Sequence, residues 1–191
     1  MTTVTEGARE RILRAADELF YSRGIRNVGI DEVIAHADVA KATLYKHFES
    51  KDLLVLECLR RRSAEARRRF LESIEKRATT PVERVLAIFD RLEATCGQTD
   101  YRGCAFVNAV VELADPNHPA HQAAVEHKQA LQDYMRQQAE EAGVKDPDAV
   151  AATLALLYDG AVVAAQRDCR SDAAHRARTA AEKLLQEGIG G

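Results

Sequence analysis

Residues 39–54, Val-Ala-Lys-Ala-Thr-Leu-Tyr-Lys-His-Phe-Glu-Ser-Lys-Asp-Leu-Leu, decide the fold of the amino-terminal part of the chain. If Leu44 is the centre of a buried helical face, a rotation of 100° per residue places Ala40 and Phe48 inside as well. The opposite face then mixes small, hydroxyl and cationic side chains, namely Ala42, Thr43, Tyr45 and Lys46. A short helix with such a face is typical of elements that enter the major groove of DNA.

Each side chain on this face has a chemical reason to meet DNA. The small Ala42 permits close approach to the groove, and Lys46 is long enough to reach a guanine edge or a phosphate. Thr43 and Tyr45 can donate hydroxyl hydrogen bonds to phosphate oxygens, and His47 at the flank can do so through a ring nitrogen.

A second anchor follows directly. Ser50 and Lys51 begin the next helix, whose free backbone amides and positive dipole end form a natural phosphate site, to which Lys51 adds a full charge. The alternative is an ordinary helical hairpin, in which Tyr45 and His47 merely cover the core, because this geometry is also common outside DNA-binding proteins.

Two helices are expected before this segment. Over residues 8–22 the apolar side chains share one helical face, and Gly24 follows as a stop. A second pattern begins behind Gly29 and ends at Asp38, which tolerates left-handed backbone geometry better than most residues. Three helices in about 45 residues, with a tight turn between the last two, predict a helix-turn-helix unit.

The run from Val39 to Phe48, the following Glu49-Ser-Lys-Asp-Leu-Leu54, and Ala15-Ala-Asp-Glu-Leu-Phe20 ahead of Gly24 resemble the signature of TetR-family regulators. The resemblance implies a three-helix DNA-binding domain, a fourth linking helix, and dimerisation mainly through the last two helices. It gives DNA-contacting roles to Lys41, Thr43, Tyr45, Lys46, His47 and Lys51.

The chain departs from the family pattern at two positions. Gly29 stands where the family often has a hydroxyl residue that caps the second helix and touches phosphate, and Ala40 stands where Ser is common. Those two contacts are therefore not expected here, and Asp38 is a candidate to act as the cap instead.

The rest of the chain predicts six more helices and no strand, so the expected fold is all-α with about nine helices. Ser50 is a good N-cap for a fourth helix that runs to about Arg77, and Thr80-Pro-Val-Glu83 predicts a capping box with Pro at the first helical position. Further helices are expected over 104–114, 119–142, 147–167 and from a cap at Ser171 to about 188. We expect a DNA-binding domain at 1–52 and a helical effector-binding and dimerisation domain at 53–191.

The carboxy-terminal part is apolar enough on three of its helices to enclose a cavity for a small, mainly hydrophobic molecule. Asn108 is a polar side chain in an otherwise apolar helix. Its amide must therefore be hydrogen-bonded, either to a ligand or to backbone. For the remaining residues the alternative is simple core packing. The candidate lining residues are Phe89, Leu92, Cys96, Phe106, Asn108, Val110, Val125, Tyr134 and Tyr158.

Small side chains on the last two helices would let helices of two subunits approach closely and form a symmetric four-helix interface. Such a homodimer has the two-fold symmetry needed to read a pseudo-palindromic operator in double-stranded DNA. The alternative is burial within one subunit. The candidate interface residues are Leu154, Gly160, Ala177, Ala181 and Leu184.

Composition and the motifs that are missing argue against several classes of protein. A formal net charge of −3 argues against a protein that coats nucleic acid non-specifically. No leader or membrane span is expected, which favours the cytoplasm. No C-x-x-C pair occurs, and His118, His121 and His127 do not converge on one side of a helix, so neither a metal site nor a cofactor is expected.

The arginine triplets 60–62 and 67–69 are interpreted as a solvated face paired with Glu57, Glu65 and Glu72 rather than as a second nucleic-acid patch.

Three functions were weighed. The first is a repressor that leaves its operator when an effector binds. The second is a redox-responsive regulator in which Cys96 and Cys104 form a disulfide, although apolar settings disfavour reactive thiols. The third is a helical enzyme or carrier, disfavoured because the sequence shows no Ser/His/Asp arrangement, paired carboxylates, phosphate loop or metal quartet. We therefore expect a DNA-binding regulator and not an enzyme.

Overall fold

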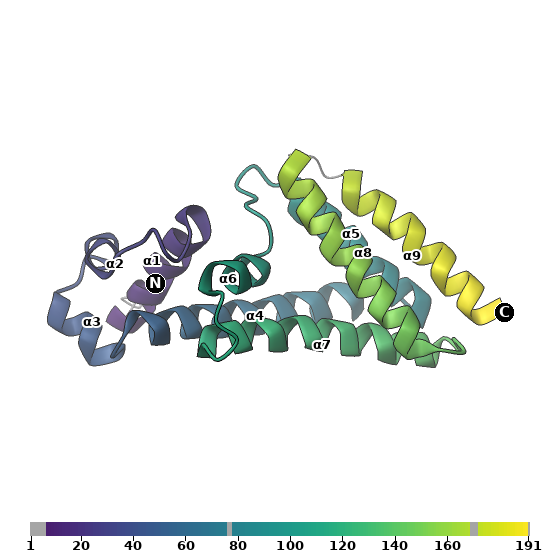
Figure 1. Ribbon diagram of the computed structural model, residues 1–191, viewed down its shortest axis with the longest axis horizontal. Coiled ribbons are helices and arrows are strands. Elements are labelled where there is room, and N and C mark those ends of the chain that lie inside the picture. Colours follow the sequence, from purple (N-terminus) through teal and green to yellow (C-terminus); the bar gives the residue numbers. More distant parts are fainter. Residues whose placement is uncertain (1–6, 76–77, 169–171, 191) are drawn as a thin grey trace, which may run out of the picture. The chain divides into compact units, whose positions relative to one another are not determined.

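The computed structural model describes residues 7–75, 78–168 and 172–190, and in this part of the chain every regular element is a helix (Figure 1). The predicted all-α fold with about nine helices is confirmed. The helices are α1 (Ala8–Arg23), α2 (Ile30–Ala37), α3 (Lys41–His47), α4 (Lys51–Glu75), α5 (Pro81–Cys96), α6 (Ala105–Leu113), α7 (Pro119–Glu141), α8 (Pro147–Asp168) and α9 (Asp172–Gly190).

Contacts within the chain divide it into two compact units. The first lies within Met1–Glu65 and Ala105–Glu126, and the second within Ala66–Cys104 and His127–Gly191. Helix α6 therefore packs with the amino-terminal helices, although residues 66–104, which directly precede it, belong to the second unit. The functional boundary expected near residue 52 stays a prediction.

The first unit is built on the apolar faces of α1, α2 and α3. Ile12 of α1, Val33 of α2 and Leu44 of α3 are all 0% exposed, so the three helices share one core. Asp38 ends α2 in the left-handed region at φ 51°, and its N–H bonds back to the carbonyls of Ala35 and Ile34. The predicted role of Asp38 at the end of the second helix is confirmed.

One prediction about this core is wrong. Ala40 was expected inside with Leu44, but it is exposed. Ala40 is the N-cap of α3 and has extended backbone, so a rotation of 100° per residue does not apply to it. No side-chain cap hydrogen bond is made at Ala40 or at Gly29, which caps α2, and Asp38 belongs to α2 rather than capping α3.

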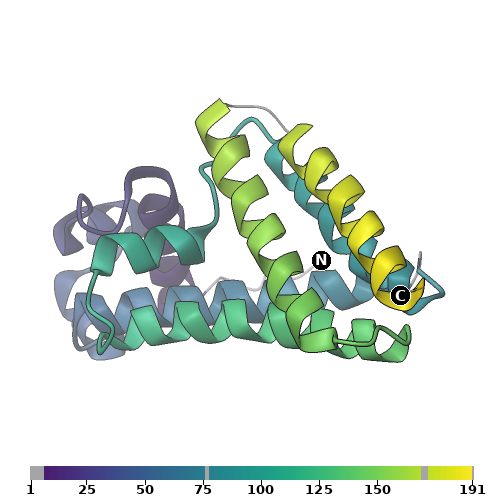
Figure 2. The ribbon, with the colours of Figure 1, turned by 45° about the vertical axis from the view of Figure 1, so that its right-hand side comes forward.

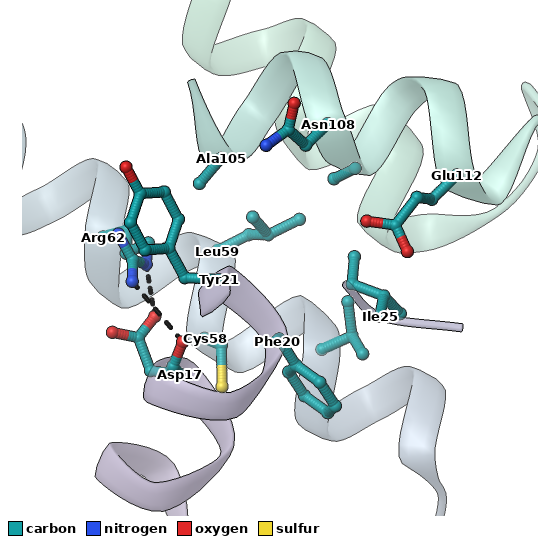
Figure 3. A pocket seen from close by; sticks show the side chains of 12 residues that line it. Asp17, Phe20, Tyr21, Ile25, Cys58, Leu59, Arg62, Ala105, Asn108 and Glu112 are labelled. Atoms are coloured by element: carbon teal, nitrogen blue, oxygen red, sulfur yellow. Dashed lines mark hydrogen bonds and ion pairs between the residues drawn. The ribbon is translucent and has the colours of Figure 1, made fainter. Parts of the chain in front are cut away.

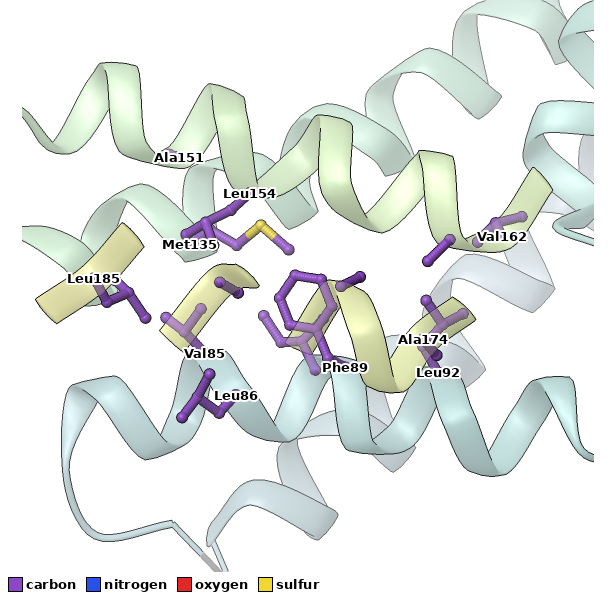
Figure 4. Close-up of a cluster of buried hydrophobic side chains, with 14 of the residues drawn as sticks. Val85, Leu86, Phe89, Leu92, Met135, Ala151, Leu154, Val162, Ala174 and Leu185 are labelled. Carbon is purple, nitrogen blue, oxygen red and sulfur yellow. The ribbon is translucent and has the colours of Figure 1, made fainter. Parts of the chain in front are cut away.

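The second unit has its core where α5, α8 and α9 pack side by side (Figure 2). Phe89 stands at the centre of this core with Met135, Leu154 and Leu185, all 0% exposed (Figure 4). The apolar spacing of each helix explains this arrangement, because residues three and four apart fall on the buried side.

The predicted helix starts agree with the structure where they can be compared. Ser50 Oγ accepts a hydrogen bond from Leu53 N at 3.2 Å at the start of α4, and the Asp146 carboxylate accepts one from Ala149 N at 3.0 Å at the start of α8. The proposed cap at Ser171 and the helix end at Arg77 lie outside the described residues.

Two expectations about burial are wrong. The apolar composition of residues 104–114 predicts a helix buried on most sides, but Val111 of α6 is 71% exposed, and within α6 only Phe106 and Ala109 are buried. Val125 of α7 was placed on an apolar face and is 48% exposed. Apolar composition by itself does not determine how many neighbours a helix has.

The arginine triplets of α4 are held largely by acidic partners. Arg60 pairs with Glu57 at 3.4 Å, and Arg61 pairs with Glu10 at 2.6 Å. In the second triplet Arg68 pairs with Glu72 at 2.9 Å. These contacts support the interpretation as a paired, solvated face.

The start of α5 forms the predicted capping box. Thr80 Oγ1 accepts a hydrogen bond from Glu83 N at 3.2 Å, and the Glu83 carboxylate accepts from Thr80 N at 3.0 Å and from Thr79 N at 2.8 Å. These backbone hydrogen bonds stabilise the ionised carboxylate and lower the pKa of Glu83 to about 2.

Glu83→Gln is expected to lower the free energy of unfolding in a pH-dependent way. Because the pKa of Glu83 lies below its ordinary value of 4.5 in the folded state, the stabilisation is complete above pH 4.5 and disappears as the pH falls toward 2. Urea denaturation between pH 2 and 7 measures the gap to wild type. Thr80→Ala is the matched control, with a loss of about 1 kcal/mol that follows this titration only weakly, because the Thr80 hydroxyl makes the smallest of the contributions that lower the pKa of Glu83. A Glu83→Gln gap that stays constant with pH would contradict the capping role of the carboxylate.

Candidate nucleic-acid interface

Helix α3 presents a polar, cationic face to solvent. Ala42, Lys46 and His47 are exposed, and Tyr45 is 44% exposed. Thr43, predicted on the same face, is half-buried, so its hydroxyl lies at the edge of the exposed surface.

The orientation of this face is fixed from inside the first unit. Leu44 is 0% exposed and Phe48 is 3% exposed, so the middle and the carboxy-terminal end of α3 are held by apolar burial. Phe48 N donates to Leu44 O at 2.8 Å, and the guanidinium of Arg9 lies over the Phe48 ring at 5.4 Å from its centroid. Buried residues at positions 44 and 48 are one helical turn apart, which leaves positions 42, 45 and 46 facing outward.

Lys41 begins α3 and is already paired within the unit. Its Nζ lies 3.0 Å from the Asp31 carboxylate of α2, and this hydrogen bond raises the pKa of Lys41. Both side chains are largely exposed, at 63% and 81%, so the pair lies in water and is weak. Lys46 has no ion-pair partner among the described residues, which leaves its charge available to a ligand.

The start of α4 supplies the second anchor predicted from the sequence. Lys51 is half-buried, and its Nζ lies 6.0 Å from the ring centroid of Phe20 in α1. The ammonium group is therefore oriented by its own unit, and Lys51 itself begins α4, where the helix dipole favours an anion.

The candidate effector residues fall into two groups. Phe89, Leu92 and Cys96 are buried in the core of the second unit, and Tyr134 and Tyr158 pack against that core. The remaining four, Phe106, Asn108, Val110 and Val125, belong to the first unit.

Aromatic contacts organise the group in the second unit. The Phe89 and Tyr158 rings meet edge to face at 6.2 Å between centroids, and Phe70 and Tyr134 do so at 5.0 Å. Burial raises the pKa of Tyr158, so its hydroxyl stays neutral.

Sequence reasoning missed Lys128 beside this aromatic group. Its Nζ lies 4.7 Å from the Tyr158 ring centroid and forms an ion pair with Asp159. Together with burial, the Lys128 charge lowers the pKa of the adjacent His127 to about 4, so this histidine is neutral at pH 7. A lysine on an amphipathic helix is normally interpreted as solvated. Only its partner Asp159, 31 residues away in the chain and in another helix, reveals the role of Lys128.

The thiols that carried the redox alternative differ in exposure. Cys96 is buried, which raises the pKa of its thiol, and the Tyr101 hydroxyl, which donates to Val162 O at 3.4 Å, counteracts this shift. Cys104 is half-buried, and Cys169 lies outside the described residues. No group of three or more His, Cys, Asp or Glu side chains in the described part of the chain is arranged to hold a metal ion. The disulfide stays an untested alternative.

Three of the candidate dimer residues pack inside their own chain. Leu154 and Ala181 are 0% exposed and Ala177 is 7% exposed, because these positions fill the seam between α8, α9 and α5. For them the alternative, burial within one subunit, holds. Gly160 is exposed and Leu184 is half-buried.

An apolar stripe on the other side of α8 was not identified from the sequence. Leu156 is 73% exposed and Val163 is 51% exposed, and they flank Gly160 at intervals of four and three residues. A stripe of this spacing lies on one helical face. Residues 147–168 are also long and apolar enough, by length and composition, to cross a membrane, although α8 packs on α9 and α5.

Comparison with known proteins agrees with this geometry. The model of bacterial regulatory proteins of the tetR family matches residues 12–58, and the model of the tetracyclin repressor-like C-terminal domain matches residues 81–181. The crystal structure of SCO4454, a TetR-family transcriptional regulator from Streptomyces coelicolor, is 33% identical, covers 95% of this chain and 96% of its own, and has a TM-score of 0.89. The chain belongs to the TetR family of transcriptional regulators.

Curated relatives of this TetR-family chain have the same character. The regulator YjdC of Escherichia coli is 27% identical over 152 residues, which is 80% of each chain. The repressor NemR of Escherichia coli is 28% identical over 108 residues, which is 56% of this chain and 54% of that one. The family and these relatives are DNA-binding regulators and not enzymes.

Asp31→Asn is expected to strengthen binding to any duplex by about threefold at low salt and to steepen the salt dependence by about one ion. The substitution removes a negative charge beside the expected phosphate contacts of Lys41 and releases Lys41 from its partner. Fluorescence anisotropy at several salt concentrations measures both effects. Asp133→Asn, which changes the net charge equally in the second unit, is the control, and equal gains for both variants would mean that only overall charge matters.

Proposed function

We propose that this TetR-family regulator is a homodimeric repressor that binds a pseudo-palindromic operator and leaves it when a small, mainly hydrophobic molecule binds the second unit. The observation that carries the DNA-binding part is the exposed face of α3, fixed from behind by the buried Leu44. The relatives NemR and DhaR are named repressors, which supports repression. A bacterial regulator of this kind acts in the cytoplasm.

The DNA contacts divide into two roles. Ala42, Tyr45 and Lys46 face the bases and the groove edges, because they are exposed on the outward side of α3. Lys51, together with the first amides of α4, binds a phosphate and sets the register, as does Lys41 at the start of α3. Thr43 and His47 flank this face and complete the phosphate contacts.

The homodimer is proposed to form through the exposed stripe of α8 formed by Leu156, Gly160 and Val163, with Leu184 of α9 beside it. An apolar stripe with a glycine at its centre allows a second helix to approach closely. The surface at Gly160 is accessible to such a helix, since a Cβ at this position would meet no described atom within 4 Å. A two-fold dimer matches a pseudo-palindromic operator, whose half-sites lie about 34 to 36 Å apart.

The effector is proposed to enter the second unit among Phe89, Leu92, Cys96, Tyr134 and Tyr158. These side chains offer apolar surface with two neutral hydroxyls and a thiol, which suits a mainly hydrophobic molecule with one or two hydrogen-bonding groups. Lys128 and Asp159 add a charged pair at the same aromatic group. A coupling of about 1 to 3 kcal/mol between this site and the operator would change DNA affinity about 5- to 150-fold.

Lys46→Ala is expected to relax the choice between duplexes, whereas Lys51→Ala is expected to weaken binding to all of them and to lower the salt slope by about one. Lys46 faces outward without an ion-pair partner in the described residues, and Lys51 lies at a helix start. Anisotropy with a duplex selected by the wild-type protein from a random library, and with its scrambled version, separates the two roles. Equal losses by both variants on both duplexes would contradict this assignment.

Leu156→Glu is expected to raise the dissociation constant of the dimer at least about tenfold, because it would bury a charge without a partner in the interface. Sedimentation velocity at several protein concentrations measures the constant. Val111→Glu places the same charge on an equally exposed apolar position of α6 and is expected to leave the dimer intact. A dimer that tolerates Leu156→Glu would exclude this stripe as the interface.

A further inference from the structure

Within the first unit, one side chain of α6 makes a hydrogen bond to the backbone of the chain between α1 and α2. The Glu112 carboxylate accepts a hydrogen bond from Arg26 N at 3.0 Å, across 86 residues of sequence. Figure 3 shows Glu112 pointing down from α6 toward the segment that carries Ile25. A charged acceptor makes this bond stronger than a contact between neutral groups.

The chain is built to allow this close approach. Gly24 has φ +90°, a conformation that favours glycine, and a Cβ at this position would lie 3.0 Å from Glu112 Oε2. Any other residue would therefore be strained and would also press against the carboxylate. The sequence identified Gly24 only as a helix stop, and the structure gives it this second role.

Apolar packing beside the contact is incomplete. A pocket of about 30 Å³ lies between α1, α4 and α6, with Tyr21, Cys58 and Glu112 among its lining residues (Figure 3). This space holds about two water molecules, so α6 lacks a continuous dry contact with α1 here. The burial of Ala109 and Ile25 is the apolar part of the docking, and the Glu112 bond is its directional part.

The segment held by Glu112 leads to the DNA-reading helix through short, ordered contacts. Gly29 O accepts from Val33 N in the first turn of α2, and Arg23 at the end of α1 pairs with Glu32 of α2. The neighbouring Asp31 pairs with Lys41 at the start of α3. A change in residues 24–29 therefore acts directly on the start of α2 and, through it, on α3.

We propose that Glu112 is a positioning residue, whose carboxylate holds residues 24–29, and through them α2 and α3, in the form that reads DNA. The inference rests on the proposed DNA-binding role of α3. Glu112 touches no base or phosphate in this account, and it acts only through the backbone of Arg26.

Three variants separate the hydrogen bond from charge and size. Glu112→Gln keeps an acceptor oxygen and removes the charge, whereas Glu112→Leu removes the charge and the acceptor but keeps the bulk. Glu112→Ala is a second variant without an acceptor, in case leucine packs poorly. Val111→Ala, at the exposed neighbouring position, controls for general changes in α6.

Two measurements on the full-length protein test the proposal. Hydrogen–deuterium exchange of peptides covering residues 24–29 is expected to quicken at least about tenfold in Glu112→Leu and Glu112→Ala and less than about twofold in Glu112→Gln. Binding to the selected duplex is expected to weaken about 5- to 10-fold in the first two variants, while binding to scrambled duplex changes less than about twofold.

Unchanged exchange over residues 24–29, or equal behaviour of Gln and Leu, would overturn the proposal, as would parallel losses on both duplexes with a lowered melting temperature. If the wild-type protein itself does not prefer the selected duplex, the proposed function fails, while the exchange measurement still decides whether Glu112 holds this segment.

Discussion

The burial of Leu44 is the interaction on which the functional surface depends. This side chain, fully enclosed by α1 and α2, fixes the rotation of a helix of seven residues that has no side-chain cap of its own. Because the rotation is fixed, Ala42, Tyr45 and Lys46 face solvent together. A helix this short is not stable in isolation, so its DNA-reading face exists only as a consequence of core packing.

Charge is arranged locally in a chain that is acidic as a whole. The arginines of α4 are largely taken up by acidic partners, and Lys41 is paired with Asp31, so few cations of the first unit are left to attract phosphate. A regulator with this balance avoids tight non-specific binding and depends on the fit of α3 for its affinity.

The helices, their boundaries and the core of the first unit could be predicted from the sequence, because they follow from interactions between residues close together in the chain. Helix periodicity predicted the core of the first unit, and Asp38 and Thr80–Glu83 marked helix boundaries through backbone chemistry that acts within four residues. What failed or was missed depends on contacts between distant segments. Periodicity could not tell that Leu154 faces its own chain while Leu156 faces solvent, since both are apolar residues of one helix. Ala40 was misplaced because a cap residue does not follow helical rotation, and Lys128 and Glu112 gain their roles only from partners that are remote in sequence.

The most direct test of the central claim compares the affinity of the wild-type protein for a duplex selected from a random library with its affinity for the scrambled duplex, at two salt concentrations. A preference of at least about a thousandfold that persists at the higher salt is the predicted result, because base contacts by α3 add to the phosphate contacts. Equal, weak and strongly salt-dependent binding of the two duplexes would contradict the account, since it would mean that the exposed face of α3 meets only phosphates.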